Sequence, residues 1–167
     1  MGAEIVKAYR VTLPPLLLIG RRYGDADRVG GGFGVHWMEW FEKGRFAALE
    51  ALPAAPAFEG AYLGAMRCPD GGFEYWIGMA FPEGTAAPDG FEAVALPAAD
   101  AAVCWLKGRE ETGELYGQRA EEATSARIRD EGWTPAGGWV MECYACPRFT
   151  TPDADGVRIL DYVTYLR

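Results

Sequence analysis

The chain has 167 residues, of which half are hydrophobic and 13% are aromatic, and its formal net charge is −8. This length suits one domain or two small fused modules, and the negative charge argues against nucleic acid as a partner, because phosphate binding requires clustered lysine and arginine. No apolar run approaches the roughly 20 residues of a membrane-spanning helix, and no signal peptide is visible. We therefore expect a cytoplasmic protein with no membrane contact and with reduced cysteines.

The first half of the chain predicts the order strand, helix, strand, strand. Residues 5–23 read as a strand that two adjacent prolines in its middle bend or interrupt. After a glycine-rich loop, apolar residues recur at helical spacing over residues 33–52, and two prolines end this helix. Residues 61–68 and 73–81 then read as two strands, because the Pro-Asp-Gly-Gly between them is typical of a hairpin.

The second half repeats this order. A strand pattern covers residues 91–108, and a polar segment rich in good helix formers covers residues 110–130. Residues 138–147 and 157–167 read as the last two strands.

Short sequence matches support an internal repeat. Val-x-Leu-Pro occurs at residues 11–14 and again at 94–97. Residues 60–69 match residues 138–147 at glycine, cysteine and proline. Each match alone is weak, but together with the repeated order of elements they favour a tandem repeat.

One carboxylate stands out in the apolar strand at 138–147. Glu142 lies between Met141 and Cys143, and the repeat aligns it with Gly64. Burying an unpaired carboxylate is costly or forces it to take up a proton. A structural requirement shared by both repeats does not explain why only one of them carries the carboxylate.

Strand alternation places Val140, Glu142 and Tyr144 on one face. A carboxylate beside aromatic rings suits a large, flat cation, which gains charge pairing together with cation–π contacts. The alternative is that Glu142 lies on a solvated sheet face or pairs with an arginine.

The sequence resembles the GyrI-like small-molecule-binding family, whose fold also serves as the effector-binding domain of AraC-type and MerR-type regulators. The motifs are VTLPPLLLIGRRYG, FEYWIG, GFEAVALPAADAAVCWLKG and the Glu-x-Tyr of Glu142 and Tyr144. No helix-turn-helix segment is visible, so the resemblance is to a stand-alone form without direct contact to nucleic acid.

The resemblance implies an α+β fold of tandem strand–helix–strand–strand modules with pseudo-two-fold symmetry, in which antiparallel sheets form a ligand cleft. Residues 1–167 would form a single domain, with module one at about 1–88 and module two at about 89–167. Family ligands lie between the modules against aromatic side chains and a glutamate, which Glu142 matches.

The function implied by the resemblance is binding of hydrophobic aromatic, often cationic, small molecules, as in multidrug or xenobiotic binding. The protein would sequester such a compound or sense it together with an unidentified partner protein. The family often places a pocket tyrosine at the position of Tyr75, and its first helix, which carries Trp37 here, borders the cleft. The candidate ligand-binding residues are Glu142, Tyr144, Tyr75, Trp37, Trp40, Trp105, Trp133 and Tyr162. Several of these aromatic residues must serve only in the core, because regular spacing more often reflects packing than binding.

An enzyme is the alternative. Some stand-alone GyrI-like proteins hydrolyse the strained cyclopropane ring of DNA-alkylating natural products. In this interpretation Glu142 is the general base and Tyr144 or Tyr75 assists it, and the sequence leaves open which tyrosine. A gyrase-inhibitor-like interaction protein follows from the family name alone.

Cys143 and Cys146 form a C-x-x-C pair, but a zinc site needs two more ligands and the chain has one histidine, His36. A redox pair would require the first cysteine at a helix N-terminus, whereas this motif lies in a strand. We expect free thiols, no metal and no cofactor.

Overall fold

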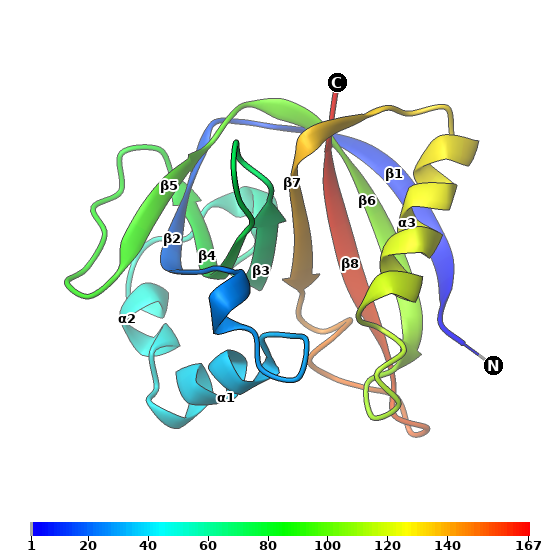
Figure 1. Cartoon of the computed structure of the whole chain (residues 1–167), viewed down its shortest axis with the longest axis horizontal. Helices are drawn as coiled ribbons and strands as arrows, with labels where there is room; N and C mark the ends of the chain where they lie inside the picture. Colours follow the sequence, from blue (N-terminus) through cyan, green and yellow to red (C-terminus); the bar gives the residue numbers. More distant parts are fainter. Residues whose placement is uncertain (1) are drawn as a thin grey trace.

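The computed structural model describes residues 2–167 and consists of one eight-stranded sheet with helices packed against it (Figure 1). The strands are β1 (Glu4–Leu13), β2 (Leu16–Tyr23), β3 (Tyr62–Arg67), β4 (Glu74–Pro82), β5 (Glu92–Leu96), β6 (Ala99–Arg109), β7 (Pro135–Tyr144) and β8 (Val157–Leu166). The helices are α1 (Gly34–Glu42), α2 (Phe46–Glu50) and α3 (Gln118–Asp130), with the short 3-10 turns η1 (Asp25–Asp27) and η2 (Pro56–Phe58). Within the described residues, no helix has the length and apolar character needed to cross a membrane.

The strand order is symmetric. It runs β1-β6-β8-β7-β3-β4-β2-β5, and every pairing is antiparallel. Exchanging β1 to β4 with β5 to β8 reverses this order and leaves it otherwise unchanged, so a pseudo-two-fold axis passes between β3 and β7. The predicted α+β fold with repeated strand–helix–strand–strand order is confirmed, although the two halves share one continuous sheet. The division of the chain near residue 88 stays a prediction.

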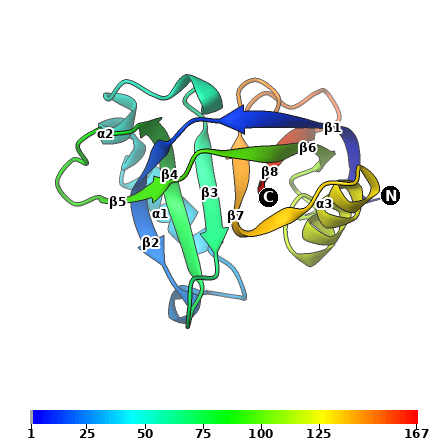
Figure 2. The same ribbon diagram turned by 90° about the horizontal axis from the view of Figure 1, so that it is seen from above.

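Two segments predicted as single strands are each divided by proline. The segment 5–23 becomes β1 and β2, which lie in opposite halves of the sheet, and 91–108 becomes β5 and β6. A proline lacks the N–H that a central strand needs, so pairing stops at Pro14 and at Pro97. At each proline the chain passes from one half of the sheet to the other. Figure 2 shows these two connections, from β1 to β2 and from β5 to β6, running side by side over the top of the molecule.

The predicted helix over residues 33–52 is also divided. Gly44 adopts a positive φ of 61°, and the Arg45 N–H bonds back to the carbonyl of Trp40 at 2.9 Å. A glycine in the left-handed region with such a backward bond is a common helix C-terminus, which ends α1 before α2 begins.

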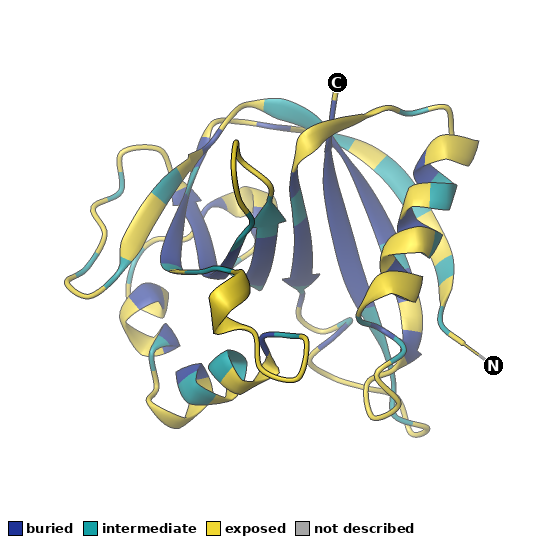
Figure 3. Cartoon of the chain, in the orientation of Figure 1, coloured by how far each residue is buried: buried dark blue, intermediate teal, exposed yellow. Residues whose placement is uncertain are grey.

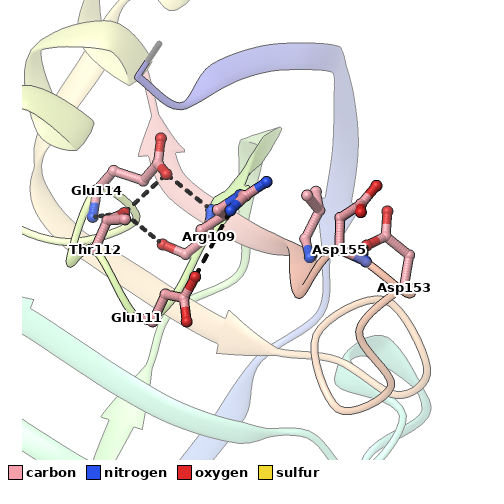
Figure 4. A network of polar contacts seen from close by, with 7 residues as sticks. Arg109, Glu111, Thr112, Glu114, Asp153 and Asp155 are labelled. Atoms are coloured by element: carbon pink, nitrogen blue, oxygen red, sulfur yellow. Dashed lines mark hydrogen bonds and ion pairs between the residues drawn. The ribbon is translucent and has the colours of Figure 1, made fainter.

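The second predicted helix starts later than expected. Residues 110–117 form a loop instead of helix, because Gly113 and Gly117 take φ values of 73° and 83°. Local polar contacts stabilise this loop (Figure 4). Glu114 Oε1 accepts a hydrogen bond from Thr112 Oγ1 at 2.8 Å and another from the Arg109 N–H at 3.1 Å. Helix α3 therefore covers only the second part of the predicted range.

The two faces of the sheet are buried in different ways. On one face the sheet curves, so that its strands pack against one another and against η2. We call this the all-strand core, and Leu63, Met141 and Val163 are among its buried residues. The other face is covered by helices: α2 contacts β4, and α3 contacts β1 and β6. Figure 3 shows the result, with buried central strands and helices exposed on their outer sides.

Candidate functional site

Glu142 lies at the centre of the sheet, beside the pseudo-two-fold axis. In β7 it pairs with Gly64 of β3 and with Tyr162 of β8. Its neighbours Met141 and Cys143 belong to the all-strand core, so Glu142 points to the helix-covered face, as strand alternation predicts.

A chain of hydrogen bonds holds the Glu142 carboxylate. The Tyr75 hydroxyl donates to Glu142 Oε1 at 2.9 Å, and Trp37 Nε1 donates to the Tyr75 hydroxyl at 2.9 Å. These residues come from β4 and α1, so the first half of the chain contacts the carboxylate of the second half.

Gly64 provides the room for this arrangement. A Cβ atom at this position would lie 2.6 Å from Glu142 Oε1 and 3.2 Å from the Trp37 ring, and it would also collide with the Tyr75 hydroxyl. A separation under 3 Å cannot exist without movement, so the carboxylate, the phenol and the indole can meet only across a residue without a side chain.

Glu142 is 8% exposed and, among residues 2–167, it has no ion-pair partner. Burial raises its pKa to about 7, although hydrogen bonds from the Tyr75 and Tyr144 hydroxyls lower the pKa in part and the Glu121 carboxylate raises it further. Glu142 is therefore neither a solvated surface residue nor the partner of an arginine. A carboxyl group in this position is ready to meet a positive charge or to exchange a proton near neutral pH.

Aromatic rings form the surroundings of the carboxylate. Tyr144 lies between Trp37 and Phe149 in two edge-to-face contacts, with ring centroids 4.9 Å and 4.8 Å apart. The Tyr75 ring stacks on Phe33 with a centroid distance of 4.3 Å. Pairs of this kind fix ring orientation and present π-faces and edges to the site.

The structure brings together five of the eight predicted site residues, Glu142 among them. Those around Glu142 are Trp37, Tyr75, Tyr144 and Tyr162. Tyr162 is 1% exposed and donates its hydroxyl to the Leu115 carbonyl at 2.6 Å, so it packs below the carboxylate.

The other three predicted aromatic residues lie away from Glu142. Trp40 is fully buried in the core beneath α1 and donates its N–H to the Tyr23 hydroxyl at 3.0 Å. Trp105 packs edge-to-face on Tyr9 in the all-strand core, and Trp133 packs below α3.

Two aromatic residues of the site did not emerge from the sequence as site residues. Phe33 lies just before α1 and Phe149 lies in the loop between β7 and β8. Phe33 shares the helical spacing of Trp37, four residues later, but such spacing more often reflects packing than binding, and Phe149 follows no strand or helix period.

The four cysteines are free, with Cys143 buried and Cys146 exposed beyond the end of β7. Within residues 2–167 there is no group of three or more His, Cys, Asp or Glu side chains that could hold a metal ion. The described site itself consists of one carboxyl group, phenols and aromatic rings.

No family model matches the chain, and no curated protein sequence matches it. Solved structures do. SAV2435 bound to tetraphenylphosphonium superposes with a TM-score of 0.71 at 16% identity, over 97% of this chain and 94% of that one. A Staphylococcus aureus MU50 protein assigned to bacterial transcription regulation gives a TM-score of 0.69 at 15% identity, over 96% and 98%. The EcmrR C-terminal domain gives a TM-score of 0.59 at 11% identity, over 96% and 97%.

At these identities the likeness concerns the fold, and it extends over nearly the whole of each chain. The strand order and the structural neighbours together show that this chain has a GyrI-like fold.

Proposed function

We propose that this protein binds hydrophobic aromatic cations, of the kind found among xenobiotics and multidrug substrates, at Glu142. One observation carries the proposal: a carboxylate that is 8% exposed lies among aromatic rings, and no cationic group of the described chain pairs with it. Taking a carboxylate out of water is costly unless an opposite charge accompanies it. A ligand cation supplies that charge.

The surrounding rings favour a bulky aromatic ligand over a small hydrated ion. Trp37 and Tyr144 offer ring surface beside the carboxylate, and a cation over such a ring gains about 0.5–2 kcal/mol. Because Glu142 is so little exposed, a ligand reaches it only when side chains around it move aside. Tetraphenylphosphonium, the compound bound to SAV2435, belongs to this chemical class.

The biological role that follows is sequestration of such a compound, or sensing of it together with a separate regulator protein. Both roles need reversible binding and neither needs chemistry at Glu142.

The test is calorimetric titration with tetraphenylphosphonium and with tetraphenylborate, an anion of nearly the same shape. We expect the wild type to bind the cation and to reject the anion. Glu142→Gln should weaken cation binding by about 1–3 kcal/mol, the scale of one charge-assisted contact. Glu50→Gln is the matched control, because Glu50 also accepts a tyrosine hydroxyl, from Tyr62 at 2.9 Å, but at an exposed site. Equal affinity for cation and anion, or an unchanged cation affinity in Glu142→Gln, would contradict the proposal.

A second candidate function is hydrolysis, which the pKa of about 7 at Glu142 favours, because a general base works best near its operating pH. Glu142 would take a proton from water, and Tyr75 or Tyr144 would position the reacting groups. The substrates would be the strained cyclopropanes of DNA-alkylating natural products, whose ring bond opens as water adds across it.

This alternative is tested by following the loss of an electrophilic cyclopropane substrate. Catalysed loss in the wild type, with substrate affinity kept and most turnover abolished in Glu142→Gln, would establish an enzyme. Substrate binding without any loss of substrate would leave the binding function alone.

A further inference from the structure

A cavity lies on the opposite face of the sheet from Glu142. Its volume is about 360 Å³, within the range of roughly 300–1,000 Å³ that small-molecule sites occupy. The floor consists of side chains from β6, β7 and β8, and the walls come from β1 and the segment around η2. The main apolar lining residues are Val11, Phe58, Val103, Cys143 and Val163.

This cavity is separate from the site at Glu142. Cys143, the residue after Glu142 in β7, lines the cavity, and successive side chains of a strand point to opposite faces. The sheet therefore lies between the two sites.

The cavity lining includes an ion pair whose carboxylate is buried. The Asp161 side chain is 5% exposed and accepts two hydrogen bonds from Arg148, from Nε to Oδ1 at 3.1 Å and from Nη2 to Oδ2 at 2.6 Å. The guanidinium of Arg148 also lies 4.5 Å from the centre of the Trp105 ring. Arg148 is thus already neutralised and stacked, which makes it a poor anchor for an anion.

Glu59 adds a negative charge without a counter-charge. It lines the cavity and has no ion-pair partner among residues 2–167. With a φ of 53°, Glu59 is the one non-glycine residue among residues 2–167 that has a left-handed backbone. Residues other than glycine rarely adopt this conformation. Burial raises the pKa of Asp161 and the nearby Glu59 carboxylate raises it further, whereas Arg148 and Lys7 lower it. The cavity lining therefore has one carboxylate, that of Glu59, without an ion-pair partner among residues 2–167.

We propose that this cavity is a second ligand site that binds a small aliphatic amine, with its ammonium group at Glu59 and its apolar body against Val11 and Val163. The Glu59 carboxylate keeps its lone pairs for the compact N–H donors of an ammonium group. The site differs in preference from that at Glu142, where rings surround a single carboxylate. This proposal does not depend on the function proposed for Glu142.

The test uses three probes of one shape: cyclohexylamine, cyclohexanol and cyclohexanecarboxylate. The readout is the methyl NMR signals of Val11, Val103 and Val163, which line the cavity. We expect saturable shifts with the amine, with an affinity at least about tenfold higher than for the alcohol or the carboxylate, as one charge-assisted contact implies.

Two variants at position 59 and one control locate the binding. Glu59→Gln and Glu59→Gly should each weaken amine binding by about tenfold or more. The glycine variant also tolerates the left-handed backbone, which keeps the fold intact. Glu142→Gln should bind the amine as the wild type does. Equal shifts with all three probes, no saturable shift with the amine, or loss of amine binding in Glu142→Gln would each overturn the proposal.

Discussion

The two halves of the sheet differ most where they meet, at Gly64 of β3 and Glu142 of β7. These residues are aligned by the sequence repeat and are direct cross-strand partners in the structure. One position carries a buried carboxylate, and the other has no side chain and so leaves room for that carboxylate, for Tyr75 and for Trp37. The comparison shows how a symmetric framework holds an asymmetric site: the glycine of one half makes the glutamate of the other half possible.

The largest expected effect comes from filling the space at Gly64. Gly64→Leu would drive a side chain into Glu142 and Tyr75, and overpacking of this kind costs about 3 kcal/mol or more at a site with no free volume. Urea denaturation should show this loss, and tetraphenylphosphonium binding should disappear.

Gly138→Leu is the control for this prediction. Gly138 also lies in β7, but an added Cβ there meets nothing within 4 Å. Its effect on the free energy of unfolding should stay within about 0.5 kcal/mol. Similar losses in both variants would mean that Gly64 has no special role.

The next effect is a pH dependence of stability that belongs to Glu142. Its pKa of about 7 in the folded protein lies above the ordinary value of about 4.3 in an unfolded chain. Folding therefore favours the protonated form, so this contribution is complete below about pH 4 and is lost as the pH rises to about 7. Relative to Glu142→Gln, the wild type should lose about 3 kcal/mol across this range.

Denaturation curves of both proteins between pH 4 and pH 8 measure this difference. The difference in free energy of unfolding between the two proteins could instead stay constant with pH, or could increase in favour of the wild type as the pH rises. Either result would show that the Glu142 carboxylate is solvated or paired with a positive charge.

The smallest effect concerns the hydroxyl of Tyr75. Tyr75→Phe removes the donor to Glu142 and leaves the Trp37 N–H without its partner, which costs about 1 kcal/mol of stability. Because the lost hydrogen bond favours the ionised carboxylate, the pKa of Glu142 should rise. The midpoint of the pH dependence described above reports this rise.

Tyr62→Phe is the matched control, since the Tyr62 hydroxyl donates to the exposed Glu50. It should leave that midpoint in place. A midpoint that moves equally in both tyrosine variants would mean that the Tyr75 hydroxyl has no specific effect on the pKa of Glu142.

The sequence was sufficient to single out Glu142 as an unusual carboxylate in an apolar strand, and strand alternation predicts the face to which it points. Its role in a site stays a prediction. The repeat predicted the symmetric order of elements, because the order of strands and helices along the chain depends on local sequence patterns. The sequence could not show that Trp37 lies beside Glu142 and that Trp105 does not, because both follow regular spacing. For Trp105 the strand register decides this: it pairs with Asp161, whereas Glu142 pairs with the next residue along β8, Tyr162.

Local backbone chemistry explains the remaining differences. The residues before Gln118 favour helix by composition, but two glycines and the contacts of Glu114 stabilise a loop there. Phe149 reaches the site from a loop, where no periodic pattern exists to predict its position.

The most direct test of a cation-binding carboxylate at Glu142 is to count the protons released when tetraphenylphosphonium binds. At pH 6.5 Glu142 is mostly protonated, because its pKa is about 7, and a bound cation should expel that proton. Calorimetry in two buffers of different ionisation enthalpy should give roughly half to one proton released per cation in the wild type, and close to none in Glu142→Gln. Cation binding with the same proton count in both proteins would contradict the central claim.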